Sequence, residues 1–211
     1  MSESVAHKGK VAVIGCGPGH PDYLTPAARK AVFDCQVLFG APRFLDLFPD
    51  FSGEKLRISG DMEVLLRDIS ELSARKRVGV LVSGDPGCFS LAENLKKRLG
   101  RDRCLIIPGI SSVQLAASRL GLSWVDTGVF SIHGRQPPAA EKILGFDTAV
   151  VLLGRDLTGL DAVWEKIVPA FTCFFCRDLG LPGEQIWRAA SLAELKSADP
   201  VNALLVLERK T

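Results

Sequence analysis

The sequence predicts an α/β protein with two lobes. Short apolar runs of strand length alternate with helical patterns along the chain, an order typical of sheets covered by helices. Three runs in the first half end in turns of glycine, proline and serine that open helices. At 211 residues, 47% of them hydrophobic, the chain is long enough to bury a substantial core.

The first lobe is expected to span residues 1–115, with the boundary inside the segment 112–122. Thr25 is a suitable N-cap for its first helix, with Pro26 at the first helical position. The predicted strands are 10–14, 36–39, 78–82 and 104–107, and the predicted helices are 24–33, 61–75, 89–99 and 113–120.

The second lobe is expected over residues 116–211, where the alternation of strands and helices begins again. Its strands are predicted at 129–132, 149–153, 172–176 and 203–207, and its most evident helix at 157–168. No repeat or low-complexity linker separates the lobes.

Composition argues against nucleic-acid and membrane partners. The 26 basic and 24 acidic residues give a formal charge of +2, and the basic residues are scattered. Residues 1–10 are polar and lack the apolar core of a signal peptide. No uncharged apolar run reaches the roughly 18 residues of a spanning helix. We therefore expect a cytoplasmic protein.

The six cysteines are expected to be reduced, because most lie inside apolar runs. Cys173 and Cys176 have the spacing of a zinc or redox pair. However, their segment reads as a buried strand, and residues three apart on a strand point to opposite faces. We favour a core strand and predict no metal site.

The centre of the predicted site is the turn Ser83–Gly84–Asp85–Pro86–Gly87, which follows the buried run 78–82. Similar turns follow the runs 10–14 and 104–107, at Gly15–Gly19 and Pro108–Ser112. In a parallel sheet these strand ends lie on one edge, so the three turns are expected to line a single cleft. The glycines leave the backbone bare for close approach of a ligand.

Two structural alternatives apply to these turns. Asp85 is also suited to be a helix N-cap, with Pro86 at the first helical position. The segment Gly15–Gly19 suggests a dinucleotide-binding turn, but His20 stands where glycine is needed and Pro18 removes an N–H. A nucleotide-binding module is therefore the less favoured interpretation.

Basic side chains at other predicted strand ends and turns are candidates for binding carboxylates. His133 and Arg135 follow the run 129–132, Arg155 follows the run 149–153, and Arg43 follows Gly40–Ala41–Pro42. An arginine fork suits a carboxylate, although each of these side chains is also compatible with a solvated or structural role.

Taken in order, Gly15–Gly19 with Leu24–Thr25, Ser83–Pro86 and Pro108–Ser112 resemble the tetrapyrrole methylases over nearly the whole chain. Within that family, the segments Leu120–Trp124 and Ser131–Arg135 most resemble the branch that methylates carbon 5 of a corrin precursor in cobalamin biosynthesis. That branch also forms the N-terminal half of a fused enzyme that acts at C5 and C15. Methylation of another ring position or of another tetrapyrrole remains an alternative. The sequence also leaves open whether the substrate contains cobalt.

The resemblance implies two lobes, each with a mixed, largely parallel sheet, and S-adenosylmethionine folded in the trough between them. It also implies a homodimer and a tetrapyrrole substrate, with C15 chemistry left to a separate methyltransferase. The implied cofactor-binding residues are Gly17, Pro18, Ser83, Gly84, Asp85, Cys88, Ser111, Ser112, Leu153, Leu179, Gly180, Ala203 and Leu204, with Asn202 nearby.

Methyl transfer to carbon requires a well-oriented donor and acceptor more than a covalent side chain. The precursor carries carboxylate arms, for which the candidates are Arg43, Arg135, Arg155 and His133. A proton must leave the methylated ring, and Asp85, His133 or water could accept it.

Overall fold

The computed structural model describes residues 9–58 and 60–210. The chain divides into two compact units: the described residues up to Ser111 form the first, and the second begins at Ser112. The expected boundary between residues 115 and 116 falls inside helix α5 (Ser112–Leu120), the first element of the second unit. The α/β class is confirmed, with helices and strands alternating in both units.

The first unit contains a five-stranded sheet in the order β3-β2-β4-β1-β5, and every pairing in it is parallel. Its strands are β1 (Val11–Gly15), β2 (Val37–Gly40), β3 (Glu54–Arg57), β4 (Val78–Val82) and β5 (Cys104–Ile107). Four of them were predicted. The edge strand β3 was not, because its residues are mostly exposed and form no apolar run.

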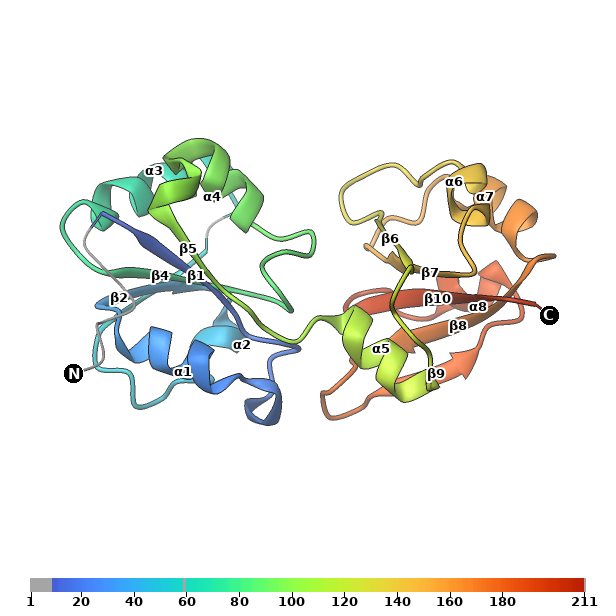
Figure 1. Ribbon diagram of the computed structural model, residues 1–211, viewed down its shortest axis with the longest axis horizontal. Coiled ribbons are helices and arrows are strands. Elements are labelled where there is room, and N and C mark those ends of the chain that lie inside the picture. The colour runs from blue at the N-terminus through green and yellow to red at the C-terminus, as the bar shows by residue number, and fades with distance from the viewer. Residues whose placement is uncertain (1–8, 59, 211) are drawn as a thin grey trace. The chain divides into compact units, whose positions relative to one another are not determined.

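Helices cover both faces of this sheet, as Figure 1 shows. Helices α1 (Pro26–Phe33) and α2 (Pro42–Leu45) pack on the face that carries Ala12 and Ile14. Helices α3 (Met62–Ser73) and α4 (Ala92–Leu99) pack on the face of Val11 and Val13. The alternation places successive β1 side chains in different cores, as the two-residue period of a strand requires. Two short 3-10 helices, η1 (Pro21–Tyr23) and η2 (Arg101–Arg103), complete the unit.

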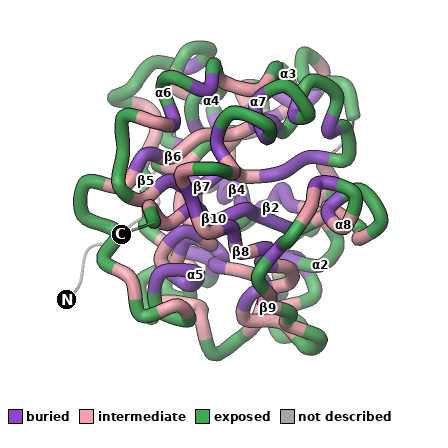
Figure 2. The backbone as a smooth tube through the Cα atoms, turned by 90° about the vertical axis from the view of Figure 1, so that its right-hand side faces the viewer, coloured by how far each residue is buried: buried purple, intermediate pink, exposed green. Residues whose placement is uncertain are grey.

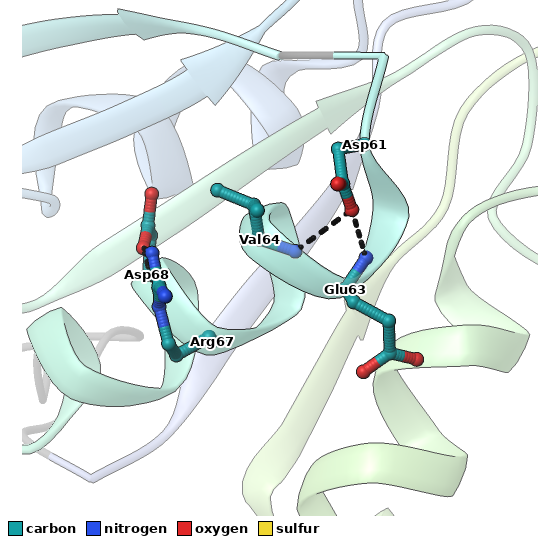
Figure 3. Close-up of polar contacts among 5 residues, drawn as sticks. All are labelled: Asp61, Glu63, Val64, Arg67 and Asp68. Carbon is teal, nitrogen blue, oxygen red and sulfur yellow. Dashed lines mark hydrogen bonds and ion pairs between the residues drawn. The ribbon is translucent and has the colours of Figure 1, made fainter.

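Side-chain caps explain where helices α1 and α3 begin. Thr25 Oγ1 accepts a hydrogen bond from the Ala28 N–H at 3.0 Å, which confirms the predicted cap of α1. Asp61 Oδ1 accepts from the N–H groups of Glu63 and Val64 at 2.9 and 3.1 Å (Figure 3). These bonds satisfy donors that a helix leaves without an internal partner.

The second unit also contains a five-stranded sheet, in the order β6-β7-β10-β8-β9. Only β6 and β7 are parallel, and the other three pairings are antiparallel. Because β7 and β8 both run antiparallel to β10, they share one direction, and the last strand lies between them. The expected mixed sheet is found in the second unit, although antiparallel pairings predominate in it, and the sheet of the first unit is wholly parallel. The strands are β6 (Gly128–Ser131), β7 (Thr148–Leu152), β8 (Phe171–Arg177), β9 (Gln185–Arg188) and β10 (Ala203–Arg209).

Three helices of the second unit contribute to a single core with one face of its sheet. They are α6 (Ala140–Leu144), α7 (Leu160–Ile167) and α8 (Leu192–Ser197). Figure 1 shows α5 on the side of the sheet opposite to α6 and α7. In Figure 2 the buried positions gather in the strands, while the loops and outer helix faces are exposed. Within residues 9–58 and 60–210, no helix is long and apolar enough to cross a bilayer.

Candidate functional site

Three strand ends of the first sheet meet at one edge. Gly15 at the end of β1 is in register with Val82 at the end of β4, and Ile14 is in register with Ile107 at the end of β5. Beyond the strands, the Gly17 N–H donates to the Gly84 carbonyl at 3.2 Å, and the Gly84 N–H donates to the Gly17 carbonyl at 2.7 Å. The turn after β1 is therefore bonded directly to the turn after β4.

Four glycines, Gly15, Gly17, Gly84 and Gly109, make this approach possible, and we call them the glycine junction. A Cβ at Gly15 would lie 2.6 Å from the Gly109 nitrogen and 2.7 Å from the Gly84 carbonyl oxygen. Gly17 and Gly84 have φ angles of 60° and 63°, which favour glycine for a separate reason. Gly15 and Gly17 are buried, and Gly84 and Gly109 are partly exposed, so the close contact between the turns depends on all four glycines.

Asp85 links the second and third strand ends. Its Oδ1 accepts from the Gly87 N–H at 2.7 Å, and its Oδ2 accepts from the Gly109 N–H at 3.0 Å. Hydrogen bonds from backbone N–H groups to a carboxylate are among the stronger ones in proteins. The side chain therefore fixes the position of the turn after β5 relative to the turn after β4.

The alternative that Asp85 is a helix N-cap is wrong. Helix α4 begins at Ala92, not at residue 89 as predicted. Phe89 has a φ of 47°, a left-handed conformation that cannot continue into a right-handed helix. The hydroxyl of Ser90 accepts from the Ala92 N–H at 3.1 Å and so satisfies one donor of the first turn.

The other predicted cofactor residues of the first unit surround the junction. Pro18 follows Gly17, Ser83 precedes Gly84, and a Cβ on Gly84 would lie 3.5 Å from the Cα of Ser111, which is buried. The half-buried Cys88 donates its N–H to the Asp85 carbonyl at 3.0 Å. Burial raises the pKa of its thiol, and the nearby Asp85 carboxylate raises this pKa further. Ser112 begins α5 and belongs to the second unit.

The predicted cofactor residues of the second unit other than Ser112 gather at one edge of its sheet. The Leu153 N–H, just after β7, donates to the Ala203 carbonyl at 3.0 Å, and Ala203 and Leu204 open β10. Ala203 pairs with Arg177, the last residue of β8, so the buried Leu179 follows at the same edge. Each unit thus brings its own set of predicted residues together.

Two residues at this edge have unusual backbone conformations that the sequence did not predict. Asp178 and Asn202 have φ angles of 50° and 56°. The Asp178 N–H donates to the Asn202 carbonyl at 3.2 Å, and Asn202 Nδ2 donates to Asp178 Oδ1 at 3.2 Å. Asp and Asn tolerate this region better than other residues, but that tendency alone is no signal for a site.

The predicted substrate-binding side chains fall into two places. In the second unit, β6 and β7 end side by side, and a Cβ on Gly154 would lie 3.0 Å from the His133 Cα. His133, Arg135 and Arg155 are all exposed around this point. In the first unit, the Arg43 guanidinium lies 4.5 Å from the centre of the Phe44 ring. That ring is also beside Gly19, where a Cβ would lie 3.3 Å from Phe44 Cε1.

The cysteine pair of β8 has the character of core residues. Cys173 and Cys176 are buried, and burial raises the pKa of their thiols to about 11 and about 12. In the described part of the chain, no group of three or more His, Cys, Asp or Glu side chains could hold a metal ion. The first unit offers glycine turns held by the Asp85 carboxylate, and the second offers exposed basic side chains at the ends of β6 and β7.

Comparison with known proteins agrees with the motifs. The chain matches the family described as Tetrapyrrole (Corrin/Porphyrin) Methylases over residues 10–196. The cobalt-precorrin-7 C(5)-methyltransferase of Salmonella typhimurium is 36% identical over 127 residues, which are 59% of this chain and 62% of that protein. The aligned region therefore spans less than two thirds of this relative.

Solved structures share the fold. The cobalamin biosynthesis precorrin-6Y methylase of Archaeoglobus fulgidus has a TM-score of 0.76 at 21% identity, covering 96% of this chain and 100% of that one. A uroporphyrin-III C-methyl transferase from Thermus thermophilus, complexed with S-adenyl homocysteine, has a TM-score of 0.74 at 23% identity, covering 94% of this chain and 97% of that one. Because the family match extends through both units, the chain belongs to the tetrapyrrole methylase family.

Proposed function

We propose that this protein is an S-adenosylmethionine-dependent C-methyltransferase of cobalamin biosynthesis that methylates carbon 5 of a corrin precursor, cobalt-precorrin-7 or precorrin-6Y. The observation that carries the proposal is the 36% identity to the Salmonella cobalt-precorrin-7 C(5)-methyltransferase within a family match over residues 10–196. The Thermus relative complexed with S-adenyl homocysteine supports the choice of methyl donor. The alternative within this class is another ring position or another tetrapyrrole.

The glycine junction suits the methyl donor. S-adenosylmethionine, when bound, supplies an electrophilic methyl group on a sulfonium. A Cβ at Gly15 would lie 2.6 Å from the Gly109 nitrogen, so glycine lets the strand ends pack directly on one another, and hydrogen bonds between Gly17 and Gly84 hold the first two turns together. We propose that the donor binds at this junction and contacts Pro18, Ser83, Cys88 and Ser111. In the second unit, we propose that it contacts Ser112 and the residues of the sheet edge, namely Leu153, Leu179, Gly180, Ala203 and Leu204.

The chemistry assigned to the side chains is orientation and proton transfer. A well-oriented pair of reactants lowers a barrier by about 7–11 kcal/mol without a covalent intermediate. Arg43, Arg135 and Arg155 would bind carboxylate arms of the macrocycle through paired N–H groups. Both oxygens of Asp85 already accept backbone N–H groups, which favours a structural role, so we propose the exposed His133 as the proton acceptor.

We further propose that the protein is a cytoplasmic homodimer and that a separate methyltransferase acts at C15. The described residues contain no membrane-spanning helix, which is compatible with this location.

Calorimetry with S-adenosylhomocysteine tests donor binding. A second experiment incubates the protein with S-adenosylmethionine and the corrin precursor, detects the added methyl group by mass spectrometry and locates it by NMR. Failure to bind S-adenosylhomocysteine would refute the class of enzyme. A methyl group on another carbon would refute only the ring position.

A further inference from the structure

The Glu184 carboxylate joins helix α5 to the turn that contains Gly180. Arg119 of α5 donates from Nε to Glu184 Oε1 at 2.6 Å and from Nη2 to Glu184 Oε2 at 3.3 Å. The Gly180 N–H donates to the same Oε2 at 2.6 Å. We call this group of Arg119, Gly180 and Glu184 the Glu184 clamp. The side chains of Glu184 and Arg119 are 25% and 35% exposed, so the contact is partly protected from water.

The Glu184 clamp contacts a turn in which three residues have positive φ angles. Asp178, Gly180 and Gly183 have φ angles of 50°, 74° and 91°. The Leu181 N–H donates to the Asp178 carbonyl at 2.9 Å, and the Glu184 N–H donates to the Leu181 carbonyl at 3.1 Å. Gly180 and Gly183 adopt these angles without strain, whereas Asp178 is a non-glycine residue that its surroundings must hold in the left-handed region. The Glu184 carboxylate adds a side-chain bond to the Gly180 N–H beside these backbone bonds.

The turn held by the Glu184 clamp carries two of the residues proposed to contact the methyl donor. It contains Leu179 and Gly180 and lies at the sheet edge where β10 begins with Ala203. The Asp178 N–H, at its start, is bonded to the Asn202 carbonyl. We propose that Glu184 is a positioning residue that presets the Leu179–Gly180 backbone for the methyl donor. This inference rests on the proposed function, since it assumes that the donor contacts this backbone.

The chemistry explains why a carboxylate is needed. Two oxygens with several lone pairs can accept from the arginine fork and from the backbone N–H together. A glutamine has one carbonyl oxygen and one NH₂ group, so it cannot serve both partners in the same geometry. A lysine at position 119 would keep the charge opposite Glu184 and would leave the bond to the Gly180 N–H in place.

The test compares four variants with the wild type, using S-adenosylhomocysteine as the probe in calorimetry and thermal unfolding as the measure of stability. We expect Glu184→Gln to weaken binding about ten-fold, or about 1.4 kcal/mol, and Arg119→Lys to stay within about two-fold. The exchange Arg119→Glu with Glu184→Arg restores an ion pair but leaves the Gly180 N–H without its acceptor, so stability should recover while affinity stays low. Glu141→Gln, which removes an exposed pair with Lys166 at 3.2 Å in the same unit, is the matched control.

A second measurement follows the turn without any ligand. Amide hydrogen exchange at Gly180 should be faster in Glu184→Gln than in the wild type, while exchange in β8 should not change. Unchanged exchange at Gly180 would overturn the inference, as would wild-type affinity in Glu184→Gln or full recovery of affinity in the charge exchange. If the wild type itself fails to bind S-adenosylhomocysteine, the proposed function is refuted, and this inference is refuted with it.

Discussion

The substitution Gly109→Ala tests whether the three strand ends depend on direct backbone contact. A Cβ at Gly109 would lie 2.7 Å from the Gly15 carbonyl carbon and closer still to the Gly84 carbonyl oxygen. Both neighbours are backbone atoms, so no flexible side chain can move aside. The φ angle of Gly109 is not in the left-handed region, which leaves steric contact as the reason for glycine.

Two contributions determine how much unfolding free energy the Gly109→Ala substitution removes. Forcing an extra carbon into a packed position costs about 1–3 kcal/mol. Moving the backbone to admit it stretches the 3.0 Å bond from the Gly109 N–H to Asp85, and a hydrogen bond to a charged group contributes about 1.5–3 kcal/mol. We therefore expect a loss of about 4 kcal/mol in unfolding free energy. For a protein of this size, that loss lowers Tm by about 8–16 °C.

Thermal unfolding and calorimetry with S-adenosylhomocysteine measure the two consequences, which are lower stability and weaker binding. Gly60→Ala is the matched control in the same unit, because a Cβ there meets no atom within 4 Å and its φ is not in the left-handed region. It should change the unfolding free energy by less than about 1 kcal/mol. A Gly109→Ala protein with a Tm within about 2 °C of wild type would refute this account of the junction.

Three further predictions address other sites. S-adenosylhomocysteine should slow modification of Cys88 by a thiol reagent but leave that of Cys104, which is also only partly buried, unchanged; equal protection of both would contradict a site at the junction. Hydrogen bonding from Arg119 lowers the pKa of Glu184 below its usual 4.5, so its contribution to stability is complete above that value and is lost as pH falls through the folded pKa. Urea unfolding of wild type and Glu184→Gln should then differ more at pH 7 than at pH 3, and an equal difference would contradict this. Arg155→Ala should raise the KM for the corrin substrate without changing S-adenosylhomocysteine affinity, and a wild-type KM would remove Arg155 from the substrate site.

The buried strands and glycine turns could be predicted because their signals are local. The run 78–82 coincides with β4, and the motif at Gly15–Gly19 marks the end of β1. The exposed strand β3 escaped prediction because it pairs through its backbone and carries no apolar pattern. The antiparallel order of the second sheet was also missed, since the insertion of β10 between β7 and β8 depends on tertiary pairing rather than on the residues of any one strand.

The site residues also divide into those that local sequence reveals and those that it does not. Glycine at a strand end can be recognised from sequence, because bare backbone is a property of the residue itself. The carboxylate of Asp85 bonds to a residue 24 positions away, which no local pattern reveals. Glu184 was missed for the same reason, since its partner Arg119 lies 65 positions earlier in the chain.

The place of β10 in the second sheet has a consequence for synthesis on the ribosome. Leu205 pairs with Val151 on one side and with Phe175 on the other, so the middle of this sheet stays open until residues 203–209 have been translated. The first sheet has all its strands once residue 107 has emerged. At about 5–20 residues per second, the first unit has several seconds in which to fold while the second still lacks its central strand.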